Sequence, residues 1–272
     1  MIRRDVQLPD GSPGWLLVSQ VDHARLSGVL ASHCARPLPI ADSNDAFRAQ
    51  LLDAIAGHDD GWAEWEVAPS LDPSDGRPLA FNELPTAEAT EIWSRSIEEA
   101  RCRSAVGGWL VAGHFLRLLE MSDDMRDDPA GVDWKNAYVA RRSRWFEEWT
   151  AEFRLHPTSD QAAQLLEWQW VFDAASLWLC LHGPLPGTND DAERWLLDEQ
   201  GALRSQWSAP GMPRPAPWGA SIAVRAEPWI FTISSLALTC PALVVPRARY
   251  VDGQTLLANA ARIELAFEIQ PS

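Results

Sequence analysis

Apolar stripes with helical spacing run through the middle of the chain, and several of them contain a histidine or an acidic residue. Side chains three, four or seven positions apart share one face of a helix. His23, His58, His114 and Asp173 lie on such faces. Their apolar neighbours at these spacings are Leu26 and Leu30 for His23, Leu51, Ala54 and Ile55 for His58, Leu110, Val111 and Leu118 for His114, and Leu166, Trp170, Leu177 and Cys180 for Asp173. The pattern predicts helices that bury ionisable groups.

This periodicity favours a mainly α fold. Helices are expected over residues 20–33, 45–58, 86–103, 105–120, 135–154 and 159–182. The two ends alternate like strands, in 2–7 and 15–20 and again after residue 219, in 221–226, 229–238, 242–251 and 262–270. The segment 201–218 is rich in Pro, Gly and Trp and is expected to form an irregular loop. Because an isolated hairpin is marginally stable in water, we expect both ends to pair in one small sheet. The expected organisation is a single domain, 1–272, with a helical body at about 19–200 and β elements at about 2–20 and 219–272.

Charge and composition limit the classes of partner. The formal net charge of -15 leaves no basic excess to bind nucleic acid or an anionic membrane surface. No apolar run reaches the length of roughly 18 residues that a membrane helix needs. The N-terminus lacks the apolar middle of a signal peptide, and the four cysteines are widely spread. These features predict a cytoplasmic protein with reduced thiols. The expected partner is a small-molecule substrate, and the oligomeric state stays open, with a homodimer as one option.

A carboxylate on an apolar face needs a partner, because an unpaired buried charge is costly. A single histidine on such a face is more often a satisfied core residue than a ligand. Several helices that converge in a bundle can nevertheless bring such groups to one point. Imidazole and carboxylate together suit a divalent metal ion: iron, manganese, zinc or magnesium.

The order of these groups resembles the HD-domain superfamily. The stretches that carry the resemblance are VDHA with His23, GHDDG with His58 and Asp59, and VFDAAS with Asp173. The resemblance implies an HD-like helical bundle in which His23, His58, Asp59 and Asp173 hold the metal. Asp60 or His114 would then act as a general base or as a ligand to a second metal. The same stretches also resemble a bacterial family catalogued only as a domain of unknown function, over most of the chain.

The HD resemblance implies a metal-dependent hydrolase of a small phosphorylated or otherwise esterified molecule. Asp60 and Trp62 stand where many HD hydrolases have an apolar residue and a lysine. The missing lysine removes a contact for phosphate. Two alternatives therefore stay open. One is an HD-type iron-dependent oxygenase, and the other is a non-catalytic small-molecule binding protein with a vestigial metal site.

Overall fold

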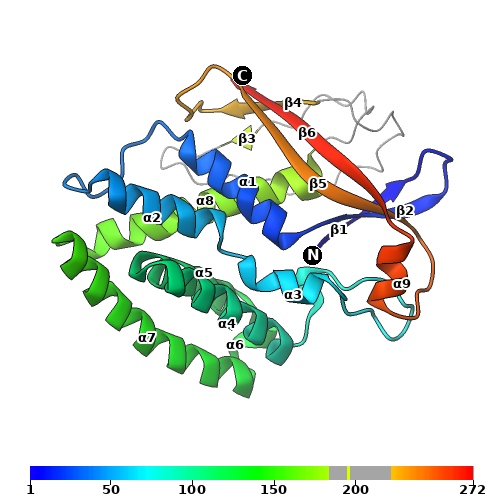
Figure 1. Ribbon diagram of the computed structural model, residues 1–272, viewed down its shortest axis with the longest axis horizontal. Helices are drawn as coiled ribbons and strands as arrows, with labels where there is room; N and C mark the ends of the chain where they lie inside the picture. Colours follow the sequence, from blue (N-terminus) through cyan, green and yellow to red (C-terminus); the bar gives the residue numbers. More distant parts are fainter. Residues whose placement is uncertain (184–194, 197–221, 272) are drawn as a thin grey trace.

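A computed structural model describes residues 1–183, 195–196 and 222–271. Its helical body consists of long helices that pack side by side (Figure 1). The helices are α1 Gln20–Ser32, α2 Asp45–Ala56, α3 Ala63–Glu66, α4 Thr86–Arg103, α5 Ala105–Met121, α6 Asp123–Arg126, α7 Pro129–Phe153, α8 Ser159–His182 and α9 Gly253–Ala258, with 3-10 turns η1 Asp60–Trp62 and η2 Phe81–Glu83. Helix α5 lies in the middle of this body, where it contacts α2, α4, α7 and α8.

One sheet joins the two ends of the chain. Its strands are β1 Ile2–Gln7, β2 Pro13–Val18, β3 Trp195–Leu196, β4 Ile222–Glu227, β5 Leu236–Pro246 and β6 Ala261–Pro271. They lie in the order β1-β2-β5-β6-β4-β3. The four strands β1, β2, β5 and β6 pair antiparallel, whereas β4 runs parallel to β6. The sheet contacts α1 through β5 and α8 through β1 (Figure 1).

The mainly α fold, with a small sheet formed by both chain ends, is thereby confirmed. Helices α4 and α8 have the predicted bounds, and β2 pairs with β5 as expected. Helix α7 begins earlier than predicted, at Pro129, because Asp128 caps it and proline suits the first helical position. Helix α2 ends at Ala56, so His58 follows the helix instead of closing it.

The C-terminal prediction is partly wrong. The expected strand at 229–238 begins only at Leu236, and of the expected strand at 242–251 only residues 242–246 are a strand, as the end of β5. Strand β5 stops at Pro246, which has no backbone N–H to continue a ladder. Helix α9 was not predicted, and its N-cap is Asp252, whose side chain accepts from Thr255 N. The irregular loop expected at 201–218 lies outside the described residues.

An arginine pair on one glutamate fastens β1 to the loop before α4. Arg3 makes a bidentate contact with Glu83, at 2.8 and 2.9 Å. Arg77 Nη1 contacts the same carboxylate at 2.6 Å, and the Ala80 amide donates to it at 2.8 Å. Burial alone would raise the pKa of Glu83, but these hydrogen bonds lower it to about 2. The ionised glutamate therefore stabilises the fold.

We expect Glu83→Gln to destabilise the protein at neutral pH by about 2 kcal/mol. Since the pKa of Glu83 falls from 4.5 to about 2 on folding, its contribution is complete above pH 4.5 and is lost as the pH falls toward 2. Urea unfolding at pH 7 and pH 3 measures both effects. Glu91→Gln is the control, because Glu91 is exposed and pairs with Arg95 on its own helix. An equal loss in the free energy of unfolding at pH 7 and pH 3 would contradict this role of Glu83.

Candidate metal centre

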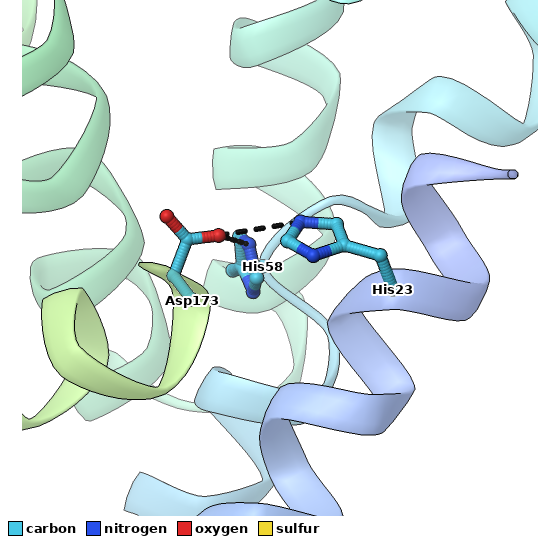
Figure 2. A group of neighbouring side chains, drawn as sticks. All are labelled: His23, His58 and Asp173. Atoms are coloured by element: carbon cyan, nitrogen blue, oxygen red, sulfur yellow. Dashed lines mark hydrogen bonds and ion pairs between the residues drawn. The ribbon is translucent and has the colours of Figure 1, made fainter. Parts of the chain in front are cut away.

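Five ionisable side chains from four parts of the helical body meet in its interior. His23 comes from α1, His114 from α5 and Asp173 from α8. His58 and Asp59 come from the turn between α2 and η1. Figure 2 shows His23, His58 and Asp173 pointing toward one another. All five are buried.

The distances make this a compact cluster of donor atoms. Asp173 Oδ1 lies 3.0 Å from His58 Nε2 and 3.2 Å from His23 Nε2. Asp59 Oδ2 lies 3.4 Å and 3.3 Å from the same two nitrogens. Ligands at about 2.1 Å from a tetrahedral ion are separated by about 3.4 Å from each other. The four nitrogen–oxygen distances are therefore close to those between the ligands of one metal ion.

Glycines allow the helices that carry these groups to approach closely. A Cβ atom on Gly28 of α1 would lie 2.4 Å from Ala56 Cβ at the end of α2. A Cβ on Gly61 would lie 2.3 Å from the backbone nitrogen of Ser96 in α4. Since neither approach leaves room for a side chain, both glycines are needed to hold the turn with His58 and Asp59 against α1 and α4.

A backbone hydrogen bond fixes the orientation of His58. Its Nδ1 lies 2.8 Å from the carbonyl oxygen of Ile55. A carbonyl can only accept, so Nδ1 carries the proton and donates it. In a neutral imidazole, Nε2 then presents a lone pair to the two carboxylates. Two acceptors facing each other need a cation or a proton between them. Histidines that bind metals show this same arrangement, with the second ring nitrogen donating to a carbonyl.

A pair of serines supports His23 in the same way. Ser176 Oγ lies 2.7 Å from His23 Nδ1 and 2.7 Å from Ser27 Oγ. Ser176 also donates to the backbone carbonyl of Asp173 at 2.9 Å. The sequence prediction did not assign these serines a role. The signal was present, because Ser27 follows His23 by four residues and Ser176 follows Asp173 by three, on the same helix faces.

The electrostatics of the cluster depend on two buried carboxylates. Burial opposes the charging of His23, but hydrogen bonds and attraction to Asp173 and Asp59 raise its pKa to about 10. The pKa of His58 is also raised, because the same carboxylates outweigh its burial. Burial would raise the pKa of Asp173, yet the three surrounding histidines lower it well below its ordinary value. Without a metal, a proton on His23 offsets part of the negative charge of the two carboxylates.

His114 stands at the edge of the cluster with a different charge state. Its Nε2 lies 3.9 Å from Asp173 Oδ2, the oxygen that does not contact the other histidines. Burial lowers the pKa of His114 to about 4. Its Nδ1 is buried and has no hydrogen-bond partner among the described residues. His114 is thus a neutral imidazole at pH 7, and its ring can accept a hydrogen bond or bind a ligand.

The structure does not bring Asp60 into this cluster. Its carboxylate lies 2.6 Å from Arg25 Nη2 and 2.9 Å from Arg103 Nη1. Arg103 also contacts Asp53 at 2.8 Å. His58, Asp59 and Asp60 are consecutive, but the turn directs the first two inward and the third into this outer ion-pair network. The residues brought together are therefore His23, His58, Asp59, Asp173 and His114.

These residues suit a metal ion. His23, His58 and Asp173 each offer one ligand atom, and the three atoms lie within 4.8 Å of one another. Asp59 adds a second carboxylate beside both histidine nitrogens. The oriented His58 nitrogen and the two carboxylates form a donor set that suits a divalent cation. A separate finding is that no described helix is both long and apolar enough to cross a membrane.

The fold and the site define a mainly α protein with a buried histidine–carboxylate centre that can hold a metal ion. The chain belongs to a family described as "Protein of unknown function (DUF3891)", which matches residues 1–247. This match confirms the resemblance to a family of unknown function and does not support the HD-domain resemblance. Comparisons with curated proteins and with solved structures give no match.

Metal binding at this site should release protons and strengthen as the pH rises. With a pKa of about 10 for His23 and a raised pKa for His58, an incoming ion must displace up to two protons at pH 7. We expect the apparent affinity for Zn²⁺ to rise by about one to two decades per pH unit. Calorimetry in buffers of different ionisation enthalpy counts the protons. An affinity independent of pH would contradict the assignment of these histidines as ligands.

Proposed function

We propose that this protein is a metal-dependent hydrolase of a small phosphorylated or otherwise esterified molecule. In this proposal His23, His58, Asp59 and Asp173 hold one divalent ion. The observation that carries it is the orientation of His58, whose Nδ1 donates to Ile55 while Nε2 faces both carboxylates. In the neutral ring Nε2 turns a lone pair toward two carboxylates, and a divalent ion between these atoms would bind all three of them.

The donor set favours a transition metal. Two imidazole nitrogens suit zinc, iron and manganese better than magnesium, which prefers oxygen ligands and retained water. Two carboxylates and two neutral imidazoles give the ligands a charge of -2. A divalent ion brings the sum to zero, which suits a buried site.

The ion would polarise the bond to be cleaved and lower the pKa of a water molecule. Hydrolysis forms a bond from the water oxygen to the acyl carbon or phosphorus, breaks the ester bond, and moves a water proton to the departing alkoxide. We assign the transport of that proton to His114, which is neutral and lies next to Asp173. Ser176 and Ile55 hold His23 and His58 in place, and Asp60 positions the turn through Arg25 and Arg103.

The iron-oxygenase alternative receives less support. A second ion would need several further ligands beside Asp173 Oδ2. Within the described ranges, His114 is the additional histidine near that oxygen, at 3.9 Å. Asp60, which was the other candidate, pairs with two arginines instead. Two irons per chain in purified protein would favour the oxygenase over the hydrolase.

Asp173→Asn should abolish stabilisation by metal, because it removes the carboxylate closest to both histidines. For the wild type we expect Zn²⁺ or Mn²⁺ at about 100 times Kd to add about 2.7 kcal/mol to the free energy of unfolding. Thermal melts with chelator and with added ion measure this difference. Asp53→Asn is the matched control, since it removes a carboxylate outside the cluster and should keep the full gain. A wild type that gains nothing from zinc, manganese, iron or magnesium would refute the proposed metal site.

His114→Ala separates proton transfer from metal binding. The variant should keep the metal-dependent rise in melting temperature, because His114 is not among the four proposed ligands. Its rate of ester hydrolysis should fall by about two to four decades, as for the loss of a general base. The control is His156→Ala, which changes an exposed histidine. Unchanged turnover in His114→Ala would remove His114 from the mechanism.

A further inference from the structure

A cavity of about 190 Å³ lies beside the metal centre. His23, Asp59, His114 and Asp173 form part of its wall. The remaining wall comes from segments outside the proposed metal ligands: the start of α1, η1, η2, α4, α5, α6 and α8. Pockets for drug-sized ligands occupy roughly 300–1,000 Å³. The cavity therefore suits a ligand about the size of one substituted ring and excludes a nucleotide.

Most of the cavity wall is apolar and aromatic. The principal side chains are Phe81, Trp93, Phe115, Leu118, Met125 and Leu177. Trp93 and Phe115 stack with their ring centroids 5.2 Å apart and their planes at 20°. Burial of apolar groups against such a surface is favourable, and the apolar side chains offer an anion neither a hydrogen bond nor a positive charge.

Two neutral polar atoms in the wall have no hydrogen-bond partner. Gln20 and Trp62 both line the cavity, with 4% and 1% of their surfaces exposed. Gln20 Oε1 and Trp62 Nε1 are buried and unpaired within the described part of the chain. A buried polar atom without a partner is costly. Both atoms are covered by protein, but because their residues line the cavity, a small rotation of either side chain would present this acceptor or this donor to a ligand that carries an N–H or O–H group and a carbonyl or hydroxyl oxygen.

The charges around the cavity argue against an anionic ligand. Among the described residues that line it, none is a lysine or an arginine. The nearby Arg25 and Arg103 are held by Asp60 in the outer network. A divalent ion with Asp59, Asp173 and two neutral histidines has a net charge of zero. A phosphate dianion in this site would lack a compensating charge, whereas an uncharged molecule needs none.

We propose that this cavity binds a small, uncharged, ring-sized acyl compound, such as an amide or a hydroxylated ester, and discriminates against phosphate esters. The inference rests on the proposed hydrolase function and specifies its substrate class. The acyl group reaches the metal centre, Gln20 and Trp62 bind its polar atoms, and the aromatic wall covers its apolar part.

Benzamide and phenylphosphonate test this class, because they share a ring and differ in charge. We expect zinc-loaded wild-type protein to bind benzamide at least about tenfold more tightly than phenylphosphonate, which corresponds to a difference in binding free energy of about 1.4 kcal/mol. Ligand-observed NMR titration at pH 7.5 measures both affinities. The inference would be overturned if the two affinities are equal, if phenylphosphonate binds more tightly, or if benzamide does not bind.

A cation placed in the wall should change this selectivity. Leu118→Lys puts an ammonium group at the cavity. We expect this variant to bind benzamide more weakly and phenylphosphonate more tightly than the wild type, so that the ratio of benzamide affinity to phenylphosphonate affinity falls by at least about tenfold. Leu116→Lys is the matched control on the same helix, because Leu116 is also half-buried but does not line the cavity. It should retain the wild-type ratio. A ratio that moves equally in both variants would place the binding site elsewhere.

Metal content, measured in parallel, separates the two proposals. Protein that holds zinc but prefers phenylphosphonate overturns the uncharged substrate class and leaves the metal-dependent hydrolase in place. Protein that holds no metal refutes the proposed function. Melting curves of both lysine variants show whether each is folded, and a folded Gln20→Leu variant gives a second test, with an expected loss of benzamide affinity of about threefold to tenfold.

Discussion

Two buried carboxylates, Asp59 and Asp173, set the requirement that the rest of the site satisfies. Each lies against the same pair of histidine nitrogens, at 3.0 to 3.4 Å. Their charges need two positive charges close by, because the interior screens them poorly. Two protons on the histidines or one divalent ion would supply the same positive charge. The charge balance of the cluster is thus the same with two protons as with one divalent ion.

The surrounding fold keeps these charges in one place. Helix α8 supplies Asp173 and Ser176, and α1 packs against it with His23 and Ser27. The close contact of Gly28 with Ala56 then brings the end of α2 to the same point. The sheet contacts α1 and α8 on their other side, so that both chain ends support the two helices that carry most of the site.

Sequence periodicity was enough to predict the long helices and four inward-facing ionisable residues, His23, His58, His114 and Asp173, because an ionisable group on an apolar stripe is conspicuous. Asp59 was identified only through the resemblance to the HD-domain superfamily. The direction of Asp60 was not predictable, since it depends on where α2 ends and on two arginines distant in sequence. The cavity wall was equally hidden, because Phe81, Trp93 and Leu118 come from segments that meet only in the folded chain.

The turn after α2 directs three consecutive ionisable side chains into two different environments. His58 and Asp59 enter the interior, where a metal ion can balance them, whereas Asp60 turns outward to Arg25 and Arg103. Because the Asp60 carboxylate pairs with both arginines, their charge is already offset within this outer network. Asp60 thereby fastens the turn that carries His58 and Asp59. The described residues that line the cavity include no lysine or arginine, so the aromatic wall stands beside the cluster without an added positive charge.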